Sequence, residues 1–285
     1  MLHSILSQIS HAYQWTGYKH IMITILLTIS ILGYGLAVLF MGQSFTSSAR
    51  WGQRRIWATS TAALAAHILV IALILSETGF RQFNMAATLS IISALLVIFN
   101  VSRGSSRESQ LLRPVIFTFA LVSLVIAAIT PLQAGQALTT RPGVTIHVGL
   151  SLVAFSVLAL AALYSLQLYY LNRLLKNKRA HALSERLPPL MTVESYFFRL
   201  LTIGTAILTL AIMSGFLFLE NMFAPGQLHK TVLSIAAWLT FNCILIVHYW
   251  RGVRGKPIII FTLIASFILI LAYYGSRFVR DIILS

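Results

Sequence analysis

Residues 144–171 read VTIHVGLSLVAFSVLALAALYSLQLYYL, without a single Asp, Glu, Lys or Arg. About 20 apolar residues in an α-helix cross the hydrocarbon core of a bilayer, so this run predicts a long, tilted membrane-spanning helix. The same character extends to the whole chain, since 58% of its 285 residues are hydrophobic, only 9% are charged and the mean hydropathy is +0.85. These figures exclude a soluble enzyme, a disordered tail and a secreted disulfide scaffold, and indicate a multi-pass membrane protein.

Seven further apolar runs accompany this one. They lie near 21–41, 56–76, 85–100, 114–133, 195–219, 228–249 and 257–276. We therefore expect an all-α, polytopic membrane helix bundle of about eight transmembrane helices, which forms a single membrane domain over residues 21–285. Ahead of it, Leu2, Ile5 and Ile9 recur at helical spacing, which predicts either an interfacial amphipathic helix over residues 1–20 or a frayed terminus.

Basic residues are concentrated in alternate loops between these runs. The richer loops carry Arg50, Arg54, Arg55, Arg103, Arg107, Arg113, Arg173, Lys176, Lys178, Arg179, Arg186, Arg251, Arg254 and Lys256. Because cytoplasmic loops are enriched in Lys and Arg, this bias places those loops in the cytoplasm and both termini outside it. The net charge of +15 then reflects topology and contact with anionic lipid rather than nucleic-acid binding. The expected location is a bacterial inner (cytoplasmic) membrane.

Several kinds of catalytic chemistry are absent from the sequence. No Asp or Glu lies in the middle of a predicted span, which argues against a proton- or sodium-coupled transporter. Cys243 is the single cysteine, so an intramolecular disulfide is excluded, and no Cys-x-x-Cys-His motif is present for covalent haem attachment. No phosphate loop, zinc-hydrolase motif or nucleophile elbow occurs either. We therefore predict no catalytic residues and no enzyme activity.

Four histidines remain as candidates for intramembrane chemistry. His67 lies inside the second run, His147 begins the fifth, and His229 and His248 stand at the two ends of the seventh. Neutral imidazole is a good axial ligand for haem iron, although a histidine in a span can equally hydrogen-bond to a neighbouring helix. At about 1.5 Å per residue, His229 and His248 lie roughly 28 Å apart on one helix and cannot ligate the same iron. The sequence alone does not choose which histidines pair.

Several segments together resemble one membrane family. The segments are IHVGLSLVAF at 146–155, AALYSLQL at 161–168, PPLMTVE at 188–194, TLAIMSGFLF at 209–218, His248 with WRGVRGK, and LAYYGSR at 271–277. They resemble the helix starts, spans and Arg-Gly-rich turn of the cytochrome c assembly protein family, the CcsA- and CcmC-like haem handlers. Within that family they resemble the YpjD-type inner-membrane branch, which also has a histidine in its second span.

The resemblance implies a protein that binds or transfers non-covalent haem b without changing it chemically. The candidate axial ligands of the iron are His67, His147 and His248. Four cations on the outer side could pair with haem propionates or simply contact lipid headgroups: Arg141, Lys230, Arg277 and Arg280. The implied partners are the lipid bilayer, haem, and other membrane proteins of cytochrome assembly or ion efflux.

The chain departs from the family pattern on the outer side. The stretch FLENMFAPGQLHKT at 218–231 contains no Trp where the haem handlers have a tryptophan-rich loop, and Ala272 or Tyr273 stands where they have a second external histidine. Two alternatives therefore stay open. One is a haem-free accessory membrane protein or permease linked to ion efflux or membrane integrity, and the other is a transmembrane electron carrier of the cytochrome b type.

Overall fold

The computed structural model describes residues 2–44, 50–78, 82–104, 106–130, 136–137, 141–176, 187–219 and 227–275. Contacts between residues divide the chain into two compact units. Unit 1 comprises residues 1–101 and 114–137, and unit 2 comprises residues 102–113 and 138–285. The expectation that residues 21–285 act as one membrane domain stays a prediction.

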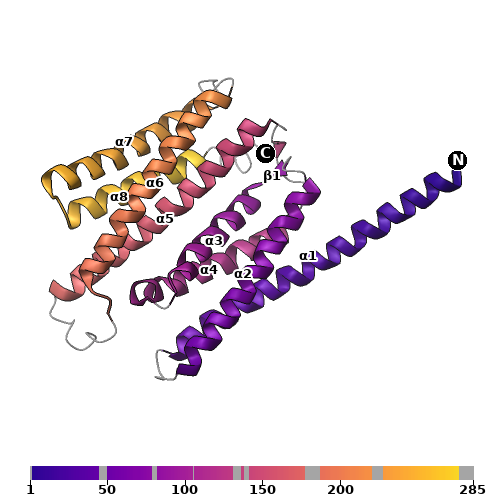
Figure 1. Cartoon of the computed structure of the whole chain (residues 1–285), viewed down its shortest axis with the longest axis horizontal. Coiled ribbons are helices and arrows are strands. Elements are labelled where there is room, and N and C mark those ends of the chain that lie inside the picture. The colour runs from indigo at the N-terminus through magenta and orange to yellow at the C-terminus, as the bar shows by residue number, and fades with distance from the viewer. Residues whose placement is uncertain are drawn as a thin grey trace. The chain divides into compact units, whose positions relative to one another are not determined.

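Helices account for nearly all of both units (Figure 1). Unit 1 is built from α1 (Leu2–Ser44), α2 (Arg50–Thr78), α3 (Met85–Ser102) and the greater part of α4 (Arg107–Ile129), with a short antiparallel ladder of β1 (Gln82–Phe83) and β2 (Gln136–Ala137). Unit 2 is built from α5 (Pro142–Lys176), α6 (Leu190–Phe218), α7 (Leu228–Arg251), α8 (Lys256–Ile270) and the π-helical turn η2 (Leu271–Gly275).

The expected number of spans is confirmed. Within the described ranges, 8 helices are long and apolar enough to cross a membrane, and each corresponds to one predicted run. The longest apolar run becomes α5, a helix of 35 residues, as its sequence predicts. The fourth helix begins at Arg107 rather than near residue 114. Pro114 therefore lies inside this helix and does not start it. The side of the membrane on which the termini lie stays a prediction.

Unit 1 is held by close helix packing and by hydroxyl contacts. A Cβ atom added at Gly33 of α1 would lie 2.8 Å from the Cβ of Ala63 on α2, so only glycine permits this approach of the two helices. Between α3 and α4, the buried hydroxyls of Ser93 and Ser123 lie 2.7 Å apart. Helix α1 is continuous from Leu2, so residues before the first span extend that helix, and their predicted interfacial position stays a prediction.

In unit 2, α5 to α8 run in alternate directions (Figure 1). Leu158 of α5 packs against Gly204 of α6, where a Cβ would come within 2.8 Å of its side chain. The indole Nε1 of Trp238 donates to the hydroxyl of Thr209 at 2.8 Å and joins α7 to α6. The bundle therefore has two ends. At one end, here called the basic end, α5 and α7 finish and α6 and α8 begin. At the opposite end, here called the His147 end, α5 and α7 begin.

Candidate functional site

The His147 end of unit 2 contains a cavity of about 200 Å³ bordered by α5, α6, α7 and α8 with η2. Its lining is mainly apolar, which suits a membrane-embedded or amphipathic ligand. The polar side chains that line it come from α5, from the beginning of α7 and from η2, and include His147, Ser151, Gln227, Lys230, Ser234 and Tyr273. Few and convergent polar groups in an apolar hollow are typical of a small-molecule site.

His147 is fixed in this cavity by the last turns of α6. Its ring Nδ1 lies 2.8 Å from the backbone carbonyl oxygen of Ala211 and 3.1 Å from the hydroxyl of Ser214. A carbonyl oxygen can only accept, so Nδ1 carries the hydrogen and Nε2 of the neutral ring carries the lone pair. Metal-binding histidines usually donate their other ring N–H to a carbonyl or carboxylate in this way. His147 is therefore oriented as a potential iron ligand through Nε2.

His67 is fully buried in unit 1 and is surrounded by hydroxyl groups. Its Nε2 lies 2.8 Å from the Ser90 hydroxyl on α3, and its Nδ1 lies 3.4 Å from the Tyr34 hydroxyl on α1. The Tyr34 ring also makes an edge contact with the imidazole, with 5.9 Å between the ring centroids. Both ring nitrogens thus have polar neighbours. A ligand role for His67 stays a prediction, and it would require one of these hydroxyls to move away.

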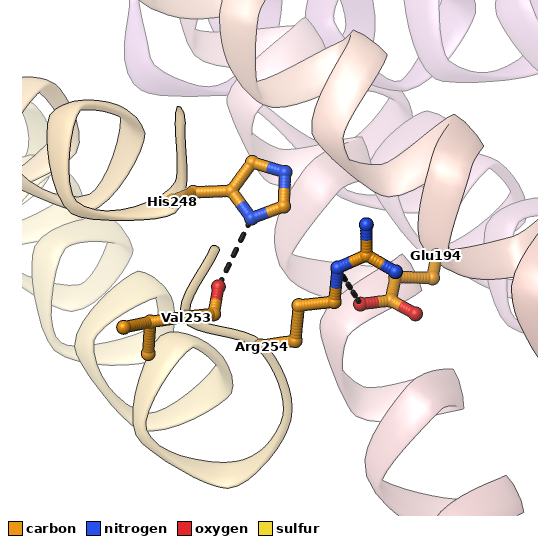
Figure 2. Close-up of polar contacts among 4 residues, drawn as sticks. All are labelled: Glu194, His248, Val253 and Arg254. Carbon is orange, nitrogen blue, oxygen red and sulfur yellow. Dashed lines mark hydrogen bonds and ion pairs between the residues drawn. The ribbon is translucent and has the colours of Figure 1, made fainter. Parts of the chain in front are cut away.

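His248 of α7 contacts both α6 and the turn that follows α7, and Figure 2 shows its contact with that turn. Its ring stacks on Phe198 of α6, with 3.4 Å between centroids and 10° between the planes, and its Nδ1 donates to the carbonyl of Val253 at 3.0 Å. Gly252 closes α7 with a left-handed φ of 65°, and its N–H donates to the carbonyl of His248 at 2.9 Å. Beside this turn, the Nε of Arg254 lies 3.9 Å from a carboxylate oxygen of Glu194.

The two candidate ligands of unit 2 are far apart. His147 contacts Ala211 while His248 stacks on Phe198, and these two α6 residues are separated by roughly 20 Å at about 1.5 Å per residue. His147 and His248 therefore cannot ligate one iron in this fold. His229 is exposed and lies outside the residues that line the cavity. Across the part of the chain that the structure describes, no group of three His, Cys, Asp or Glu could hold a metal ion.

The four cations predicted on the outer side do not all lie at the cavity. Lys230 lines the cavity, and Arg141 is exposed immediately before α5. Arg277 and Arg280 lie outside the described residues. The position expected for the second external histidine of the family is also a cavity wall, because both Ala272 and Tyr273 line it. What the sequence did not indicate is the Ala211 carbonyl, because a backbone acceptor has no signature in residue types.

Comparison with known proteins identifies the family. A family model described as "Cytochrome C assembly protein" matches residues 56–284. This chain belongs to the cytochrome c assembly protein family. Because that match begins at the second span, it includes every helix that lines the cavity and all three candidate iron-ligand histidines, His67, His147 and His248.

Several individual proteins are similar to this chain over about two thirds of its length. "Inner membrane protein YpjD" of Escherichia coli strain K12 is 37% identical over 194 residues, which cover 68% of this chain and 73% of that protein. An "Uncharacterized 28.8 kDa protein" of Azospirillum brasilense is 33% identical over 202 residues, again 68% and 73% of the two chains. "Protein HemX" of Brevibacillus brevis is 26% identical over 197 residues, or 66% and 70%.

The comparisons also confirm the expected location. The chain is a multi-pass inner membrane protein, since it carries eight membrane-spanning helices within its described ranges and is similar to an inner membrane protein of Escherichia coli. No solved structure matches this family member.

Proposed function

We propose that the protein binds haem non-covalently at the His147 end of unit 2, where Nε2 of His147 would hold the iron. The cytochrome c assembly family is associated with haem handling, and the proposed role is to hold or pass on haem without making or breaking its covalent bonds. The observation that carries the proposal is the hydrogen bond from Nδ1 of His147 to the Ala211 carbonyl. It fixes the tautomer that leaves the lone pair of Nε2 available for iron, and Nε2 belongs to a residue that lines the cavity.

The cavity lining fits part of a haem. Phe155 and Tyr273 contact each other with 5.8 Å between their ring centroids and supply an aromatic wall against which a porphyrin face can lie. Lys230 lines the same cavity and is suited to a propionate. The volume of about 200 Å³ lies below the roughly 300–1,000 Å³ of pockets that enclose drug-sized ligands, so these walls would leave part of a haem uncovered. Bound haem would supply an iron centre, and Nε2 of His147 would hold it.

The test is a visible absorption spectrum of the purified protein, oxidised and then reduced with dithionite, after expression with a haem precursor. We expect a Soret band in the wild type that His147→Ala abolishes. His229→Ala is the matched control, because this exposed histidine lies near the same cavity without lining it. A Soret band that survives His147→Ala would refute the ligand assignment, and a colourless wild-type protein would refute haem binding.

A second candidate is a haem-free accessory protein or permease. The small cavity volume favours it, as does a lining that contains no tryptophan among the described residues. It predicts a colourless but cooperatively folded protein, and a deletion strain with altered sensitivity to metal ions that the plasmid-borne gene restores. If His147→Ala restores that strain as well as the wild type does, the cavity histidine has no part in this role.

A further inference from the structure

Unit 2 contains a second cavity, at its basic end, that the proposed haem site does not use. Its volume is about 230 Å³, and it lies between the end of α5 and the beginnings of α6 and α8. Most of its walls are apolar and include Leu168, Leu190, Phe197, Phe198, Ile258 and Ile259. Among the described residues, the polar side chains that line it are those of Asn172, Glu194 and Arg254. An apolar hollow with a polar border at the end of membrane-spanning helices suits an amphipathic ligand.

The polar border is built around Arg254. Figure 2 shows the His248 ring next to Val253, and Arg254 directed toward Glu194. The hydrogen bond from His248 to the Val253 carbonyl and its stacking on Phe198 hold this turn against α6. Arg254 is nevertheless 61% exposed, and its contact with Glu194 is a long one, 3.9 Å from Nε. The guanidinium is therefore positioned by the fold and still accessible to an anion from outside.

The positive charge at this end of unit 2 favours an anionic ligand. Among the described residues of this end, the exposed basic side chains include Arg173, Lys176, Arg199, Arg251, Arg254 and Lys256. Basic pockets between transmembrane helices bind anionic lipid headgroups, because charge attraction and hydrogen bonds to phosphate add to the burial of the chain. A water-soluble phosphate compound would meet the same arginine but would leave the apolar hollow unfilled.

We propose that this cavity binds an anionic phospholipid, with its phosphate at Arg254 and part of one acyl chain between α5, α6 and α8. This inference is independent of haem binding, because the two cavities lie at opposite ends of unit 2. The lipid joins the α7–α8 turn to α5 and α6, and so it adds to the contact that His248 makes between this turn and α6. The bound class is defined by a net negative phosphodiester headgroup together with an acyl chain.

The experiment measures the unfolding temperature of the full-length protein, delipidated in a neutral detergent, during titration with phosphatidylglycerol. We expect a saturable rise with phosphatidylglycerol, and little or no rise with phosphatidylcholine or with glycerol phosphate, which has no acyl chain. Native mass spectrometry of the same samples counts the lipid retained. Equal stabilisation by glycerol phosphate would overturn the proposal, because the cavity would then have no part in binding.

A pair of charge variants tests the headgroup contact. Arg254→Gln should weaken the apparent affinity for phosphatidylglycerol about tenfold, because a charge-assisted contact to phosphate is lost. The control is Arg251→Gln, which removes the same charge from the last turn of α7 without altering the cavity lining. If the two variants lose equal affinity, the lipid is attracted by overall charge and the specific site is refuted.

A pair of size variants tests the acyl chain. Leu190→Trp adds an indole to a partly buried wall position, whereas Met191→Trp adds one to a neighbouring position that is 72% exposed and does not line the cavity. Leu190→Trp should abolish the saturable rise while leaving the unfolding of the lipid-free protein cooperative, and Met191→Trp should behave like the wild type. Unchanged lipid binding by Leu190→Trp would show that no chain enters the cavity and would overturn the proposal.

Discussion

His67 in unit 1 and His147 in unit 2 are both histidines of membrane-spanning helices, yet their ring nitrogens meet different acceptors. His67 lies between two hydroxyls, each of which can donate or accept, so both of its nitrogens can be satisfied at once. His147 meets a backbone carbonyl, which accepts only, so one nitrogen keeps its lone pair. The neighbouring groups thus separate His67, whose two ring nitrogens can both be satisfied between helices, from His147, which keeps a lone pair on Nε2 beside a cavity.

The largest effect on stability is expected at His67. Replacement by Ala removes a fully buried ring and leaves the hydroxyls of Tyr34 and Ser90 without their partner, at a cost of about 3 kcal/mol in the free energy of unfolding. Denaturant unfolding in detergent measures this cost, and the absorption spectrum should keep its Soret band. A stable His67→Ala protein that had lost its Soret band would reverse the comparison and make His67 a ligand.

Ser90→Ala should have the next largest effect on the free energy of unfolding. It keeps the His67 ring but deprives Nε2 of the hydroxyl at 2.8 Å, which should lower the free energy of unfolding by about 1–2 kcal/mol. Thr61→Ala is the control, since that exposed hydroxyl bonds only to carbonyls of its own helix. Equal losses in the two variants would mean that the buried contact to His67 contributes nothing beyond a helix-surface hydroxyl.

His147→Ala should have a smaller effect on folding than His67→Ala. The ring is only partly buried, and its loss leaves the Ala211 carbonyl still bonded to the Ser214 hydroxyl at 2.7 Å. We expect the free energy of unfolding of the haem-free protein to fall by about 1 kcal/mol or less. The unfolding of apoprotein, prepared without haem precursor, measures it. A loss as large as that of His67→Ala would show that His147 is mainly structural.

The smallest effect is expected for Ser214→Ala. His147 keeps its shorter contact with the Ala211 carbonyl, so the tautomer is unchanged and stability should fall by only about 0.5 kcal/mol. The Soret band should persist at full intensity per protein. If this band is lost, the hydroxyl rather than the carbonyl sets the orientation of His147, and the contrast with His67 becomes weaker.

The spans were predictable because each depends on composition over many residues. A run such as 144–171 needs no partner to identify it, and its boundaries moved by only a few residues in α5. The start of α4 was harder to predict. Pro114 is favourable in a first helical turn, but nothing in the neighbouring sequence indicates that the helix has already begun at Arg107.

The site was predictable only as a set of residue types. The sequence placed His147 at the beginning of a span, and its resemblance to the family marked it as a ligand. The distinction from His67 depends on Tyr34, Ser90 and the Ala211 carbonyl, which belong to other helices. Which faces of those helices meet the histidines is decided by their rotation about their own axes. Apolar residues that surround a membrane helix on all sides do not specify that rotation.

The π-helical turn η2 changes the rotation of the side chains about the helix axis at the end of α8. A π turn contains one residue more than an α turn, and one residue corresponds to about 100° around a helix axis. The extra residue therefore acts as a local change of pitch that sets the direction of the aromatic pair Tyr273 and Tyr274 beside Phe155. Deleting Ala272 would restore the ordinary helical pitch and turn these rings away while leaving both tyrosines in the chain. The position of the aromatic wall of the cavity thus depends on the number of residues in this turn as well as on their types.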